Sequence, residues 1–192
     1  MNASLIIVMI TSLTFLQSCD LIESRKPESP SETKSNYRVP VEPSDVINNI
    51  KNAFTDKNAN DYKKNFSSGQ PLVDRDFYFL PSSNVAPYFP PDWNIGSEFQ
   101  YFNNLVITVP ENNPINVSFT NEEYDVQGDS AIYSSTYSIS VPVLNSVPII
   151  YGGSTKFIMI TDQNSVWVIY YWEDIAQQGF KSWSELKYEF SQ

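Results

Sequence analysis

The side chains of this chain that could do chemistry are carboxylates, tyrosines and a single cysteine, because its 192 residues include one Cys and no His. Without His there is no imidazole base, no Ser-His-Asp or Cys-His nucleophile and no His-containing zinc site. One Cys also excludes a framework of intrachain disulfides. The chain contains no phosphate-binding glycine loop and no HExxH, GxSxG or SxxK motif. We therefore expect no cofactor and no metal.

The most enzyme-like combination lies on a predicted strand near the C-terminus, which carries Tyr170, Trp172 and Asp174. Strict alternation along a strand predicts that these three side chains share one face. An apolar pocket raises the pKa of a carboxyl, and a tyrosine hydroxyl can donate to a developing oxyanion. The competing interpretation is that Asp174 ends the strand and hydrogen bonds to the next turn. We favour the second interpretation.

Three further residues could line a pocket. Asp76 opens a predicted strand, and Tyr133 and Tyr137 share one face of a strand whose other face is rich in Ser and Thr. We expect Asp76 to be a solvated strand end and the two tyrosines to pack in the core. The tryptophans at 93, 167 and 183 sit in regular apolar patterns and are also expected in the core. No residue is assigned a catalytic role.

Acidic residues dominate, with 22 Asp and Glu against 12 Lys and Arg and a net charge of −10. This balance argues against a nucleic-acid partner, whose phosphates attract Lys and Arg. No Lys or Arg occurs between Arg75 and Lys156, which predicts an acidic face.

Residues 122–125 and Asp129 offer oxygen ligands for calcium, but Ser134 stands where an EF-hand loop needs Glu. We interpret them as an exposed acidic turn; a cationic ligand or metal is the alternative.

The single cysteine follows a short apolar segment at the N-terminus. Residues 5–10 are all apolar, a run too short to span a bilayer, and Leu16-Gln17-Ser18-Cys19 precedes a polar stretch. These four residues resemble the lipobox of bacterial lipoproteins. The resemblance implies cleavage before Cys19, acylation of Cys19 and anchoring to a membrane of the bacterial cell envelope, inner or outer. An uncleaved anchor or an ordinary signal peptide is the alternative.

The chain is accordingly divided into three parts. Residues 1–18 are the predicted signal peptide, and residues 19–43 are the lipidated cysteine with a tether that mixes Pro, Ser and charges of both signs. Val39 and Val41 are the alternative first contacts with the domain. Residues 44–192 suffice for a single domain with its own core.

Apolar periodicity predicts an α+β domain, with N-terminal helices packed on a curved antiparallel sheet and a short C-terminal helix. Helical spacing begins after Ser44, and period-two alternation takes over from residue 115. Gln127-Gly128-Asp129 predicts a hairpin turn, and Ser182 with Glu185 predicts a capping box. The predicted helices start near 44, 59, 95 and 182, and the predicted strands cover 77–80, 115–120, 133–141, 149–160 and 166–172.

This order of elements resembles the nuclear-transport-factor-2-like (NTF2-like) superfamily. The resemblance is carried by the helix at 44–54, the strand at 77–80, the helix start Trp93…Glu98 and the final strand 167–174. It implies a cystatin-like cone whose interior is the ligand site. The superfamily includes dehydratases, isomerases, cyclases, transport factors and many bacterial envelope proteins of unknown role.

Our leading hypothesis is a non-catalytic envelope lipoprotein whose domain binds a small ligand or an envelope protein; a homodimer is also compatible. The rival hypothesis is a dehydratase or isomerase with Asp174 or Asp76 as general acid–base. A third is a carbohydrate-binding module, which needs several exposed coplanar aromatic rings. A buried apolar cavity that contains a carboxylate with a raised pKa favours the enzyme, and a cone filled by side chains argues against it.

Overall fold

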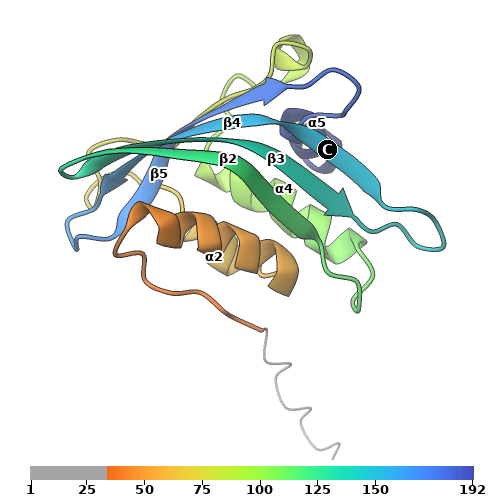
Figure 1. The fold of residues 1–192 in the computed structure, drawn as a ribbon, viewed down its shortest axis with the longest axis horizontal. Coiled ribbons are helices and arrows are strands. Elements are labelled where there is room, and N and C mark those ends of the chain that lie inside the picture. The colour runs from red at the N-terminus through yellow and green to blue at the C-terminus, as the bar shows by residue number, and fades with distance from the viewer. Residues whose placement is uncertain (1–33) are drawn as a thin grey trace, which may run out of the picture. The chain divides into compact units, whose positions relative to one another are not determined.

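The segments with helical spacing and those with period-two alternation fold into helices and a five-stranded sheet, with the helices on the inner side of the sheet (Figure 1). The computed structural model describes residues 34–192, so Cys19 and the predicted signal peptide lie outside the described residues. The elements are α2 (Pro43–Asp56), α3 (Ala59–Lys63), β1 (Tyr78–Leu80), η2 (Ala86–Tyr88), α4 (Ile95–Thr108), β2 (Asn116–Gln127), β3 (Ser130–Val141), β4 (Ile149–Thr161), β5 (Trp167–Ala176) and α5 (Trp183–Phe190).

The sheet has the strand order β1-β5-β4-β3-β2 and confirms the predicted α+β class. β2, β3, β4 and β5 are antiparallel neighbours, whereas the short β1 pairs parallel with β5, so that the sheet is mixed. The predicted hairpin turn is confirmed: Gln127 pairs with Ser130, and Gly128 has a φ of +63°. Figure 1 shows the sheet curving over α2 and α4.

Local signals explain the helix ends. Glu42 and Asp45 form a capping box at the start of α2, and α2 buries Val46, Ile50 and Phe54 against the sheet. The predicted capping box at Ser182 and Glu185 is confirmed at the start of α5. No helix among the described residues is long and apolar enough to cross a membrane.

The segment before α2 packs along that helix, so the packed part of the chain begins before the predicted boundary at Ser44. The Asn49 side chain accepts from the backbone N–H of Arg38 at 3.0 Å and donates to its carbonyl at 2.7 Å. Pro40 is buried, and its carbonyl accepts from the N–H of Trp167 at 3.1 Å. Backbone contacts and Pro40 therefore hold this segment, while Val39 and Val41 are exposed.

Candidate functional site

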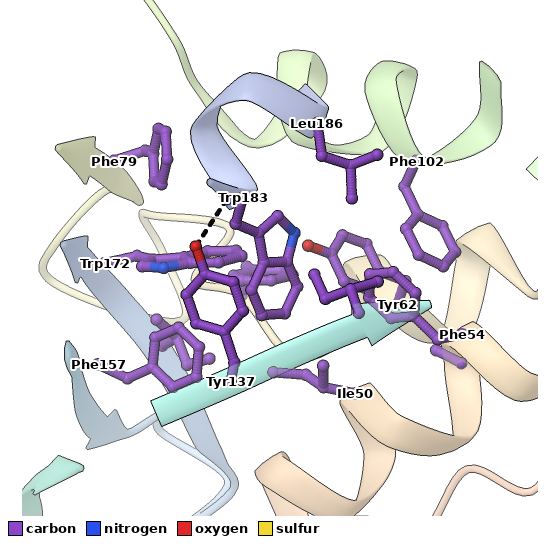
Figure 2. Close-up of a cluster of buried hydrophobic side chains, with 14 of the residues drawn as sticks. Ile50, Phe54, Tyr62, Phe79, Phe102, Tyr137, Phe157, Trp172, Trp183 and Leu186 are labelled. Carbon is purple, nitrogen blue, oxygen red and sulfur yellow. Dashed lines mark hydrogen bonds between the residues drawn. The ribbon is translucent and has the colours of Figure 1, made fainter. Parts of the chain in front are cut away.

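Aromatic rings fill the space between the helices and the sheet, where the resemblance places a ligand. Figure 2 shows Trp183 projecting from α5 into the middle of the cluster. Its ring meets that of Trp172 edge-on at 4.6 Å between centroids, and Tyr62 stacks on Phe102 at 4.0 Å. The expected core position of the tryptophans at 93, 167 and 183 is confirmed. The largest aromatic side chains with under 2% exposure are Phe54, Tyr62, Tyr101, Phe102, Tyr133, Tyr151, Phe157, Trp172 and Trp183.

Asp174 lies at the edge of this cluster and is buried. The hydroxyl of Tyr137 donates to its Oδ1 at 2.7 Å, and the N–H and hydroxyl of Ser184 both donate to Oδ2. Tyr137 in turn accepts from the backbone N–H of Trp183 at 2.7 Å (Figure 2). Burial raises the pKa of Asp174, while these donors act against that shift. The carboxylate thus ties β5 to β3 and to the first turn of α5.

The prediction that Tyr170 shares a face with Trp172 and Asp174 is wrong. The register between β4 and β5 shifts by one residue: Met159 pairs with Ile169, but Ile158 pairs with Tyr171. Tyr170 is the extra residue of this bulge, and a bulge breaks the alternation of faces. Its hydroxyl accepts from Nη1 of Arg75 at 3.0 Å on the outer side of the sheet.

Of the other candidates, Tyr133 lies inside the domain and Asp76 does not. Tyr133 stacks on Phe157, with 5.7 Å between ring centroids, and its hydroxyl donates to Glu122 at 2.9 Å. Asp76 is exposed, in an isolated bridge with Ser68. The structure therefore brings together four of the six predicted pocket residues: Tyr133, Tyr137, Trp172 and Asp174.

A buried ion pair that sequence reasoning missed lies beside Trp172. Nζ of Lys187 donates to Oε2 of Glu98 at 2.8 Å, and both side chains are at most 1% exposed. The ammonium lies 3.3 Å from the ring centroid of Trp172 and 3.5 Å from that of Phe79. Burial lowers the pKa of Lys187 to about 8, although Glu98 acts in the opposite direction.

Glu98 has two further donors, the hydroxyl of Tyr62 at 2.6 Å and Nε1 of Trp93 at 2.7 Å. A signal for this site exists in the sequence. Lys187 follows Trp183 by four residues on α5, and Glu98 precedes Phe102 by four residues on α4. A residue four positions from a buried aromatic shares its helix face, so both charges stand on apolar faces.

Two neighbouring rows across the inner face carry polar atoms that have no hydrogen-bond partner in the described part of the chain. Ser135 pairs with Thr155, and Thr155 pairs with Asp174. The hydroxyls of Ser135 and Thr155 and Nε1 of Trp172 are buried and unpartnered. Buried polar groups usually have a partner, so these three atoms are exceptions within the described interior.

The outer side of the sheet carries a groove of about 980 Å³ between residues 70–75 and strands β2 to β5. Isoleucines from β3 and β4 lie in it, with Tyr170 and Arg75 beside them. The predicted acidic turn is wrong in detail: residues 122–125 belong to β2, and Asp125 joins the groove rim. The carboxylates of the groove belong to Asp74, Asp125, Asp129 and Asp162.

Comparison with known proteins shows the fold. A protein of unknown function with a cystatin-like fold from Nostoc punctiforme has a TM-score of 0.51 and 10% identity, covering 73% of this chain and 92% of its own. A proposed dehydratase of the NTF2-like family from Streptomyces avermitilis has a TM-score of 0.51 and 11% identity, covering 70% and 93%. The domain has the NTF2-like, cystatin-like cone fold.

The comparison assigns no specific function to this cone. A protein of unknown function from Mycobacterium tuberculosis is similar as well, with a TM-score of 0.52, 14% identity and coverage of 70% of this chain and 69% of its own. No family model and no curated protein matches the chain. Since these identities are low, the likeness extends to the fold alone.

Proposed function

We propose that the chain is a lipid-anchored protein of the bacterial cell envelope whose cone domain binds another envelope protein on the outer side of its sheet. The observation that carries the non-catalytic part is that two buried carboxylates, Asp174 and Glu98, are both engaged in hydrogen bonds. Asp174 accepts three hydrogen bonds from Tyr137 and Ser184, and Glu98 accepts from two aromatic residues and pairs with Lys187. Aromatic rings occupy the volume around them.

The outer groove supplies the binding surface, because it combines isoleucine side chains with four carboxylates and one Arg. Its chemistry fits a partner segment that carries apolar side chains and Lys or Arg. A second copy of this acidic chain would bring like charges together, which disfavours a homodimer through this face.

Photo-crosslinking in cells tests this proposal. A benzoylphenylalanine at position 170, inside the groove, should give an adduct of discrete mass, and one at the exposed Tyr88 outside the groove should not. Asp129→Lys should abolish the adduct, because it reverses one charge on the rim. Equal adducts at both positions, or an adduct of twice the chain mass, would contradict a basic partner.

Lipid anchoring has a separate test. Metabolic labelling with a palmitate analogue should tag the wild-type chain and leave Cys19→Ser untagged, because Cys19 is the only thiol available for acylation. Labelling that persists in Cys19→Ser would refute the anchor without affecting the groove proposal.

A second candidate function is an enzyme of the dehydratase or isomerase kind. The observation in its favour is that Asp174, with its raised pKa, borders a surface hollow of about 440 Å³ shared with Leu80 and Pro81. The test offers β-hydroxy carbonyl compounds to the purified full chain. Turnover that Asp174→Asn abolishes while the fold is retained would replace the leading proposal.

A further inference from the structure

Exposed aliphatic side chains gather at one end of the domain. Leu144 and Val147, in the connection between β3 and β4, are 72% and 80% exposed, and Ile107 near the end of α4 is 73% exposed. Leu144 and Ile107 line one surface groove of about 590 Å³. Figure 1 shows the β3–β4 connection extending past the helices. We call this set the apolar end; its members are Ile107, Val143, Leu144, Val147, Ile149 and Ile150.

The apolar end has few charges near it. No charged residue occurs between Asp129 and Lys156, a stretch that contains the whole connection. The cation in its groove, Lys57, donates from Nζ to the carbonyls of Pro110 and Glu111, both at 2.6 Å. Isolated exposed aliphatic residues are ordinary, but a contiguous group of them marks a surface that binds a protein, a membrane or an apolar ligand.

The chain that leads towards Cys19 leaves the domain at this same end. Asn58 donates to the carbonyl of Lys34 at 3.2 Å, and Nζ of Lys34 lies 3.0 Å from Asp56. Asp56 and Asn58 flank Lys57, the residue that shares a groove with Leu144. The first described residue therefore lies at the end of α2 that borders the apolar end.

We propose that the apolar end inserts into the surface of the bilayer that holds Cys19. The inference rests on the proposed lipidation of Cys19. Residues 20–33 cannot separate Cys19 from Lys34 by more than roughly 50 Å, whatever their conformation. Such a linker keeps the domain at a high effective concentration near the lipid, so a shallow contact of a few aliphatic side chains suffices.

A thiol-attached fluorophore tests the insertion. In the lipidated full chain, Cys19 is acylated, and Val147→Cys supplies a single free thiol for an environment-sensitive dye. In phosphatidylcholine vesicles the dye emission should shift to the blue. Val126→Cys, in β2 where it pairs with Ala131 at the start of β3, is 52% exposed; it is the matched control and should not shift. Adding Leu144→Asp to the Val147→Cys chain should reduce the inserted fraction about tenfold.

The outcomes separate insertion from anchoring. Palmitate labelling without a blue shift at position 147 would overturn the insertion and leave the anchor standing. The unlipidated Cys19→Ser chain carrying Val147→Cys gives the third outcome. If its dye shifts with protein concentration in the absence of vesicles, the apolar end binds a second copy and the proposal is wrong.

Discussion

The two faces of strand β3 differ: the inner face is buried and hydrogen bonded, and the outer face borders an open groove. Tyr133 and Tyr137 point inward and are buried, and their hydroxyls are bonded to Glu122 and Asp174. On the outer face, Ser138 is exposed and Ile132 lies in the open groove. Inside, Asp174 is hydrogen bonded to Tyr137 and Ser184, and Glu98 is paired with Lys187. The carboxylates of the outer groove remain accessible. Substitutions inside should therefore change stability, and substitutions outside should change binding.

The largest effect is expected from Lys187→Met, which leaves Glu98 charged and buried without its cation. The free energy of unfolding should fall by about 3–5 kcal/mol, measured by urea denaturation. Lys156→Met on the outer face is the matched control and should change stability by less than about 0.5 kcal/mol. Adding Glu98→Gln should recover part of the loss. An unchanged midpoint for Lys187→Met would show that the pair contributes no stability.

A smaller loss is expected from Asp174→Asn. The amide turns an NH₂ towards donors of Tyr137 or Ser184, so one buried donor loses its acceptor. The cost should be about 1–3 kcal/mol in the same measurement. Asp125→Asn, on the groove rim, is the control and should leave the free energy of unfolding unchanged. Equal effects of the two variants would contradict the division between the faces.

The third expected effect, the smallest for a change of one pH unit, is a dependence of stability on pH. The pKa of Lys187 is about 8 in the folded chain, below its ordinary value of 10.5, so between these values the unfolded chain binds more protons. Stability should therefore rise with pH from about 8, by at most about 1.4 kcal/mol per pH unit. Buried Tyr62 and Tyr101 have raised pKa values, so their contribution falls above pH 10. Lys187→Met should remove the rise; a rise that persists would assign it to another group.

Local patterns predicted most of the fold but only part of the site. The strand and helix periods, the hairpin at Gly128 and the capping box at Ser182 depend on neighbouring residues, and all appear in the structure. The face of Tyr170 was wrongly predicted, because a bulge depends on how β5 pairs with β4 rather than on the sequence of β5 alone.

Local patterns signalled the ion pair of Lys187 and Glu98 only in part, because they place each charge on an apolar helix face but do not pair the two. Each residue looks like an ordinary solvent-facing charge on a helix, although each shares a face with buried aromatics. They are 89 residues apart in the chain. Only the packing of α5 against α4 decides that the two charges meet and that the rings of Trp172 and Phe79 enclose the ammonium.

By itself the sequence determined the α+β class, the order of the elements and the faces of the regular strands, because these follow from short-range periodicity and capping. It also excluded catalysis by an imidazole, because the chain has no His. The tertiary structure decided that aromatic rings fill the cone, that the buried carboxylates Asp174 and Glu98 are engaged and that the apolar end lies where the chain leaves the domain. These features depend on contacts between distant segments, and distant contacts leave no periodic trace in the chain.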